Sequence, residues 1–236
     1  MNPLTDRLTA LRDDAQAASL SRFFKTGPGQ YGEGDRFLGI KVPTVRAVVK
    51  EEWRTCTHRQ LEQCLASEFH EVRLAALLAL VQQFKHARRD PVAQQSCIDF
   101  YMSHLAAVNN WDLVDLSCYE LLGTWLLDKD AAPLHALARD GRTLWERRIG
   151  IVSTMQFLRH GRLDDTYAIA DLLLHDPHDL IHKAVGWLLR EAGKRDEERL
   201  RQWLKPRYRT MPRTMLRYAI EKFAPDVRQA FLHGLA

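Results

Sequence analysis

Residues 109–123 read NNWDLVDLSCYELLG, and this stretch connects the fold of the chain with its candidate chemistry. Either Asn109 or Asn110 can cap a helix that begins at Trp111. Trp111 and Asp115 are four residues apart, and residues four apart lie on one face of a helix. The indole and the carboxylate are therefore predicted to project in the same direction, while the leucines of the stretch supply a buried face.

Similar helical segments recur along the chain and can be aligned with this stretch. One position of the alignment then reads Arg73, Asp115, Arg148, Lys183 and Arg217, at intervals of 33 to 42 residues. Such intervals are typical of solenoids built from helix pairs. Four copies carry a cation at this position and one carries an acid, which makes Asp115 the exception. Two residues later the side chains are small enough for helices to approach closely: Ala75, Ser117, Gly150, Val185 and Ala219.

The rest of the chain is predicted to be helical as well, with no convincing strand. Residues 1–24 are predicted to form one amphipathic helix. Eleven or twelve antiparallel helices with short connections predict an all-α fold, an α-α superhelix or curved solenoid, in a single domain spanning residues 1–236. Further helices are predicted at 43–53, 57–67, 69–85, 91–108, 110–127, 131–139, 143–160, 164–174, 177–193, 196–204 and 212–223, with a short one after Pro225.

A glycine-rich segment, Gly27–Gly34, interrupts this helical pattern. Each glycine costs a helix about 1 kcal/mol relative to alanine, so the segment is predicted to be a loop or a short hairpin. A phosphate-cradling loop is the alternative, but the glycine spacing matches neither the P-loop nor the dinucleotide-binding fingerprint. Tyr31, Lys25 and Arg36 could still contact a phosphate.

Composition restricts the class of protein. The chain has 236 residues and a formal net charge of +4, and its isoelectric point of about 8.9 only permits nucleic-acid binding. The four cysteines form no CxxC motif and are interpreted as buried thiols of a cytoplasmic protein. No signal peptide or membrane-spanning run is recognised, so no membrane partner is predicted.

The distribution of cations is more informative than their number. In a solenoid the second helix of each pair usually lines the concave face. Arg73, Arg148, Lys183 and Arg217 are therefore predicted to form a basic groove that suits a phosphate backbone, with salt-dependent binding. A solvated basic face without a ligand is the alternative. Flanking cations add to the predicted groove: Arg147, Arg190, Lys194, Arg195, Lys205, Arg207, Arg209 and Arg213.

A carboxylate in a phosphate-binding groove needs a reason, and two are open for Asp115. The first is a salt bridge to Arg148 in the next repeat. The second is a cationic ligand or transition state, because Trp111 and Trp187 together with a carboxylate suit a positively charged aromatic group such as an N-alkylated purine. Loss of that base produces an oxocarbenium-like sugar, which the carboxylate would stabilise while it positions water. Core packing is the alternative for each tryptophan.

Two other groupings of reactive residues are less favoured. Polar residues near Pro177 resemble a metal site, but they straddle a predicted helix start, where polar side chains are expected anyway. Ser117 and Cys118 suggest nucleophiles, yet no histidine is placed by sequence to activate them. No metal or other cofactor is therefore predicted. The metal-like residues are His175, Asp176, His178, Asp179 and His182.

Several motifs taken together resemble the AlkD family of HEAT-like-repeat DNA alkylation repair proteins: WDLVD at 111–115, WERR at 145–148, LIHKAVGWLLREAGKR at 180–195 and MPRTMLRYAIEKF at 211–223. The resemblance covers nearly the whole chain. It implies excision of N3- and N7-alkylated purines from double-stranded DNA without a metal and without base flipping. It implies a catalytic role for Asp115, substrate contacts for Trp111 and Trp187, and a groove arginine at Arg148, or at Arg147 if the register shifts by one.

One difference from the family limits what the resemblance implies. Family members known for base excision carry a short N-terminal helix that contacts DNA, and here the corresponding stretch is the glycine-rich KTGPGQYGEGD. Some relatives bind DNA structures with little or no excision. The leading hypothesis is a monomeric alkylpurine DNA glycosylase. The alternatives are a non-catalytic binder of damaged or branched DNA and, less favoured, a protein–protein scaffold.

Overall fold

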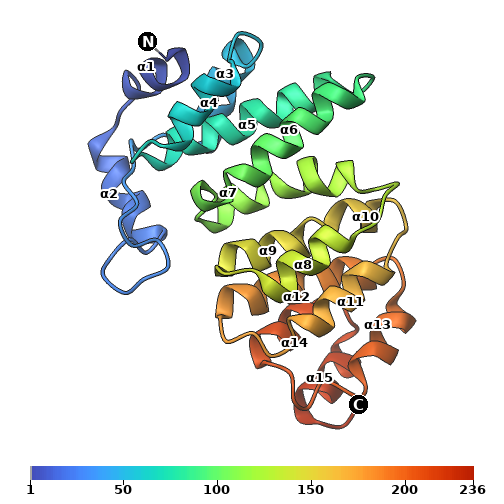
Figure 1. Ribbon diagram of the computed structural model, residues 1–236. Helices are drawn as coiled ribbons and strands as arrows, with labels where there is room; N and C mark the ends of the chain where they lie inside the picture. The colour runs from blue at the N-terminus through green and yellow to red at the C-terminus, as the bar shows by residue number, and fades with distance from the viewer. Residues whose placement is uncertain (1) are drawn as a thin grey trace. The chain divides into compact units, whose positions relative to one another are not determined.

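The computed structural model describes residues 2–236, and these form helices joined by short turns (Figure 1). Within this range no strand is present, and the single β-type contact is an isolated parallel bridge between Arg36 and Phe69. The prediction of an all-α fold is confirmed. No helix among the described residues is long and apolar enough to cross a membrane.

The chain divides into two compact units, one ending at Ser117 and the other running from Cys118 to Ala236. The prediction of a single domain stays a prediction. The helices of the first unit are α1 (Pro3–Thr9), α2 (Asp14–Phe23), α3 (Val42–Glu52), α4 (His58–Leu65), α5 (His70–His86), α6 (Pro91–Ser103), the 3₁₀ turn η1 (Leu105–Ala107) and α7 (Trp111–Asp115). Those of the second are the π-helical turn η2 (Tyr119–Gly123), α8 (Ala132–Asp140), α9 (Leu144–Val152), α10 (Met155–Arg159), α11 (Asp164–Leu172), α12 (Asp179–Gly193), α13 (Glu197–Leu204), α14 (Arg213–Ala219) and α15 (Pro225–His233).

Helix α5 is the centre of the first unit. It packs against α1, α3, α4, α6 and α7, and all of its residues from His70 to Val81 are buried. A helix that is buried on every side needs apolar residues all round, and the run LAALLALV supplies them. The polar residues at its N-terminus, His70, Glu71 and Arg73, are buried too and require partners.

The second unit is built around α12, which packs against α9, α11, α13 and α14. Helices α8 and α9 form a close pair, and Gly150 shows how close: a Cβ at this position would lie 2.8 Å from the Leu134 carbonyl oxygen and 2.9 Å from the Ala138 nitrogen. The small residues picked out by the repeat alignment are all buried. The repeat pattern therefore identified buried positions, and at one of them, Gly150, two helices approach closely.

The N-terminal helix differs from its prediction. Instead of one helix over residues 1–24, α1 ends at Thr9 and α2 begins at Asp14. Asp13 is extended and caps α2 by accepting from the Gln16 nitrogen at 3.0 Å, while its own N–H donates to the Leu38 carbonyl at 2.8 Å. A residue bonded to a distant turn in this way cannot continue a helix, so the helix is interrupted here.

The predicted helix over residues 110–127 is also broken. Helix α7 ends at Asp115, and a π-helical turn follows from Tyr119. The hydroxyl of Ser117 donates to the Leu113 carbonyl at 2.6 Å, a local bond of the kind that bends helices. The predicted helix over residues 143–160 is likewise divided into α9 and α10.

Candidate active site

Trp111 and Asp115 lie at the two ends of α7, and both line one cavity of the first unit, with a volume of about 430 Å³. The cavity lies between α2, the segment that leads into α3, the N-terminal half of α5, and α7. The structure thus brings the indole and the carboxylate to the same space, as their spacing predicts. The full lining is Leu20, Phe23, Phe24, Phe37, Ile40, Lys41, Val42, Pro43, His70, Glu71, Leu74, Trp111, Asp112, Asp115 and Leu116.

Aromatic side chains from the end of α2 hold the Trp111 ring. The ring of Phe24 stacks on it with centroids 5.3 Å apart and planes 15° from parallel, and Phe23 meets it nearly edge-on at 6.1 Å. Phe24 also stacks on Phe37 at 5.0 Å. Phe24 is buried, whereas 64% of Phe23 is exposed. The indole is therefore supported on one face by a packed aromatic cluster.

A buried histidine connects this cluster with two carboxylates. The Nε2 atom of His70 donates to Asp112 at 2.8 Å, and Nδ1 donates to Asp35 at 3.2 Å. Burial opposes the imidazolium, but the hydrogen bonds to Asp112 and Asp35 outweigh it and raise the pKa of His70 to about 9. The ring also packs against Phe37 and Phe24 with centroids 4.7 and 5.0 Å away, which favours a cation.

Asp35 is the centre of this network. Burial raises the pKa of its carboxyl group, but the hydrogen bond from His70, the charge of Arg73 and the amide of Asn110 together lower it below the ordinary value. Arg73 donates through Nη2 at 2.5 Å and Asn110 through Nδ2 at 2.9 Å. The Asn110 side-chain oxygen in turn accepts from the backbone nitrogen of Trp111 at 2.8 Å. Asp35, at the end of the glycine-rich segment, is thereby joined to the start of α7.

Glu71 fixes the opposite wall of the cavity. Its carboxylate accepts from the backbone nitrogens of Leu38, Gly39 and Ile40 at 2.8 to 3.0 Å. A buried carboxylate that accepts charge-assisted hydrogen bonds of this kind satisfies a turn that would otherwise have unpaired donors. The segment that carries Phe37 and Ile40 into the cavity is thus held to the first turn of α5.

Arg73 lies within the same buried network. The structure places its guanidinium against Asp35 and against the Ser67 carbonyl, which it reaches at 2.9 Å, with 5% of the residue exposed. A phosphate contact by Arg73 would require this pair to open, and separating a buried pair is costly. The groove role of Arg73 stays a prediction.

The second unit holds the other predicted contact residues on three neighbouring helices. Lys183 and Trp187 are one turn apart on α12, Arg148 is on α9, and Arg217 is on α14. Helix α12 packs against both of the others. Arg148 is buried and its Nη1 donates to the Leu180 carbonyl at 2.6 Å, at the start of α12. These four residues are therefore gathered within one unit.

Several of the cations predicted for the groove form ion pairs within the second unit. Lys183 pairs with Asp179 at 2.7 Å, Lys194 pairs with Glu191 at 2.7 Å, and Arg190 pairs with Glu221. Pairs as exposed as those of Lys183 and Lys194 contribute about 0–1 kcal/mol, so a phosphate can replace the carboxylate there at small cost. Arg147, the alternative to Arg148, pairs at 2.6 Å with the buried carboxylate of Asp176.

The residues of the two less favoured groupings have structural partners. Asp176 accepts from the His178 nitrogen, the His178 ring accepts from the Leu180 nitrogen, and the His182 ring bonds the Asp176 carbonyl. These contacts organise the start of α12. Within residues 2–236 no group of three or more potential ligands is arranged to hold a metal ion. The Ser117 hydroxyl is buried and bonded to Leu113 and Tyr101.

Comparison with known proteins shows the family of this chain. The family model described as DNA alkylation repair enzyme matches residues 4–223, nearly the whole chain. This chain belongs to the DNA alkylation repair enzyme family. DNA is therefore the partner that membership implies. A search of curated protein sequences gives no match.

A solved structure supports the fold. The predicted DNA alkylation repair enzyme from Enterococcus faecalis superposes with a TM-score of 0.69 and 19% sequence identity, covering 91% of this chain and 97% of that one. At this level of identity the likeness concerns the fold alone.

Within this DNA alkylation repair protein, sequence reasoning missed the buried charged network at the cavity wall. Asp35, His70 and Asp112 come from three separated segments, and their spacing in the sequence matches no motif. One signal was present: Asp112 is inside WDLVD, the stretch singled out for Trp111 and Asp115. Trp111 and Asp115 were predicted as site residues because they share a helix face, whereas Asp112 is buried.

Proposed function

We propose that this protein is an alkylpurine DNA glycosylase that cleaves the N-glycosidic bond of N3- or N7-alkylated purines. The observation that carries the proposal is the placement of Asp115 and Trp111 on one cavity whose other walls are chiefly apolar and aromatic. An alkylated purine is a planar cation, and an indole beside a carboxylate attracts such a group. A carboxylate near apolar walls acts more strongly on a developing positive charge than one in water.

The reaction is written as a hydrolysis. The bond between C1′ and the purine nitrogen breaks, and its electron pair leaves with the base, which becomes neutral. The sugar acquires oxocarbenium character, which the Asp115 carboxylate stabilises. Water adds to C1′, and its proton passes to Asp115 or to solvent. Because the alkylated base is already a good leaving group, no other acid is required.

The other residues bind and position the DNA. Trp111, supported by Phe24, holds one face of the damaged nucleotide. In the second unit, Trp187 is assigned a substrate contact, and Arg148, Lys183 and Arg217 are assigned contacts with phosphates. These assignments follow the repeat alignment and the family resemblance. Since phosphate contacts dominate affinity, binding should weaken steeply with salt.

Single-turnover release of 7-methylguanine from duplex DNA tests the proposal, with wild type compared with Asp115→Asn. We expect release by wild type and a rate at least about 100-fold lower for the variant, because one electrostatic group is removed. DNA affinity should be equal or higher, because a charge that repels phosphate is lost. Asp99→Asn, which removes an exposed acid of α6, is the matched control and should behave as wild type.

The possible results separate the hypotheses. Release by both proteins would remove Asp115 from the mechanism. Release by neither, with salt-dependent binding retained, would favour a non-catalytic binder of damaged or branched DNA and would point to the glycine-rich segment as the reason. Absence of salt-dependent DNA affinity in wild type would favour a protein–protein scaffold.

A further inference from the structure

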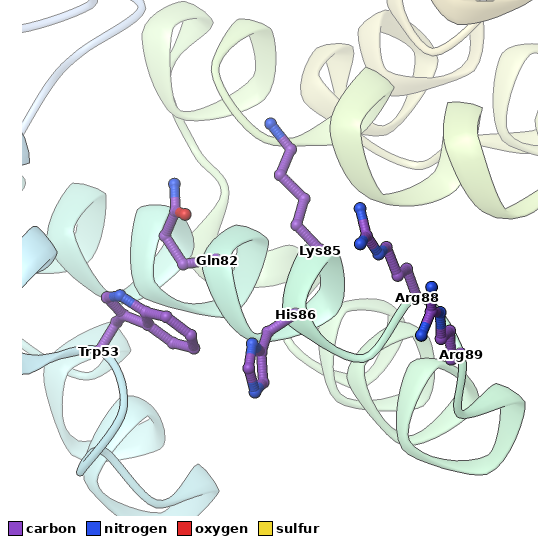
Figure 2. Close-up of a pocket in the computed structure, with 6 residues that line it drawn as sticks. All are labelled: Trp53, Gln82, Lys85, His86, Arg88 and Arg89. Atoms are coloured by element: carbon purple, nitrogen blue, oxygen red, sulfur yellow. The ribbon is translucent and has the colours of Figure 1, made fainter.

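Two adjacent hollows lie at the other end of α5 from the candidate active site, both within the first unit. One, of about 430 Å³, is lined by Trp53, Gln82, Lys85, His86, Arg88 and Arg89 (Figure 2). The other, of about 320 Å³, is lined by Arg46, Val49, Lys50, Trp53, Leu78 and Gln82. They share Trp53 and Gln82, and none of the described residues that line them is acidic. We call the cations Arg46, Lys50, Lys85, Arg88 and Arg89 the distal basic surface.

We propose that the distal basic surface binds the phosphodiester backbone of duplex DNA at a distance from the damaged nucleotide. The proposal rests on the DNA-binding part of the proposed function and not on its chemistry.

The wall between the hollows is fixed by packing. The Trp53 ring meets His86 at 5.3 Å with an interplanar angle of 63°, and the Arg54 guanidinium carbon lies 4.4 Å from its centroid. Gln83 donates to the Trp53 and Cys56 carbonyls at 3.0 and 2.7 Å. Because only 8% of Trp53 is exposed, its ring offers no face for a base to stack on. The surface therefore suits phosphates and not unpaired bases.

The neighbouring acids are turned toward other partners. Glu51 and Glu52, the acids of α3, both pair with Arg7 of α1, at 2.6 and 2.7 Å. Asp90, which follows Arg89, accepts from the Val92 and Ala93 nitrogens and caps α6. These contacts engage the acids nearest in sequence to Arg46, Lys50, Arg88 and Arg89 with partners other than those cations.

Four exposed cations of the distal basic surface can therefore bind an anion. Among residues 2–236, no carboxylate forms an ion pair with Arg46, Lys50, Arg88 or Arg89. The helix dipole accounts for cations at the end of α5 and for Lys50 in the last turn of α3, but Arg46 lies one turn earlier on α3, where that effect has faded. Cations concentrated this way repel one another, and an anion relieves the repulsion.

The position of the surface predicts how much DNA it needs. Helix α5 has 17 residues, and His70 lines the cavity while His86 lines the distal hollow. At 1.5 Å per residue the two are separated by about 24 Å. With 3.4 Å per base pair, a duplex that runs along this distance contacts the distal basic surface about 7 base pairs from the cavity. A duplex that is centred on the cavity and extends less far than this to either side should not reach it.

The experiment measures the dependence of duplex affinity on salt. Arg88→Ala/Arg89→Ala and Arg46→Ala/Lys50→Ala are compared with wild type on duplexes of about 24 and about 8 base pairs, each with 7-methylguanine at its centre, so that the short one extends about 4 base pairs to either side of the cavity. The control is Arg12→Ala/Arg59→Ala, which removes two exposed cations of the same unit that line neither hollow. All six side chains are exposed, and a circular-dichroism melt checks each fold.

On the long duplex each test variant should lower the slope of log K against log salt by about 1 to 2, since each phosphate contact contributes about 0.9. On the short duplex the variants and wild type should coincide, and the control should match wild type on both. An unchanged slope on the long duplex, or an equal loss in the control, overturns the inference. If wild type binds DNA without salt dependence, the inference and the proposed function fail together. If excision is absent but the slopes change as expected, only the proposed chemistry fails.

Discussion

The Nε2 atom of His70 lies 2.8 Å from a carboxylate oxygen of Asp112, the residue that directly follows Trp111. This contact joins α5 to α7 in the wall of the cavity. Because Asp35 binds the other ring nitrogen, the imidazole is held between two carboxylates from segments on either side of it in the sequence. The orientation of α7, and with it that of Trp111, therefore depends on a charged histidine.

This arrangement predicts that stability depends on pH. The pKa of His70 is raised from 6.5 to about 9, so its contribution is complete below about pH 6.5 and is lost as pH rises through 9. A shift of this size corresponds to on the order of 3 kcal/mol of unfolding free energy. Denaturant unfolding of wild type between pH 6.5 and 9.5 should show this loss, while His70→Gln should be less stable at pH 6.5 and nearly flat. Parallel curves for the two proteins would contradict the charged network.

The stacking of Phe24 on Trp111 predicts a second effect. Phe24→Leu removes a ring that supports the indole, and aromatic pairs contribute about 0.5–1.5 kcal/mol beyond area burial. We expect the single-turnover excision rate to fall up to about 10-fold, with DNA affinity changed less than twofold. Phe100→Leu, which replaces an aromatic residue of α6 outside the cavity, is the control. Equal losses in both variants would indicate a general effect of losing a ring.

The difference between what could and could not be predicted follows from sequence separation. The shared cavity of Trp111 and Asp115 follows from four-residue spacing, and the buried small positions follow from the repeat, because both are local rules. The bond between Asp35 and Asn110 joins residues 75 apart, and no periodicity marks it. The break between α1 and α2 was missed for a related reason, since at Asp13 a tertiary hydrogen bond overrides an amphipathic pattern.

Ion pairing of the predicted groove cations was only partly within the reach of sequence. Lys183 and Asp179 are four residues apart on one helix, so their pair could have been anticipated. Arg190 and Glu221 lie on or beside different helices, and only their packing brings them together.

Gly39 gives a prediction about stability. Its φ of +88° is in the left-handed region, and a Cβ would lie 2.0 Å from the Asp13 carbonyl oxygen. Gly39→Ala should therefore destabilise the protein by more than about 2 kcal/mol, because it adds backbone strain and forces the segment around Gly39 away from the start of α2. Gly29→Ala is the control, since its φ is +73° but the space around it is open. It should cost only about 1–2 kcal/mol in chemical denaturation. Equal losses would show that the approach of Asp13 is unimportant.

Arg217 and Arg190 should differ in how much they contribute to DNA binding. Arg217 is exposed, and no carboxylate among the described residues pairs with it, whereas Arg190 pairs with Glu221 and lies 3.4 Å from Glu191. A phosphate can approach Arg217 directly but must displace carboxylates from Arg190. Arg217→Ala should therefore lower the slope of log K against log salt by about 0.9, and Arg190→Ala by less than half of that. Fluorescence titrations of a labelled duplex at salt concentrations of about 0.05 to 0.2 M measure both slopes. A larger effect at Arg190 would mean that its ion pair opens on DNA and that the pairing seen in the free protein does not determine which cations bind.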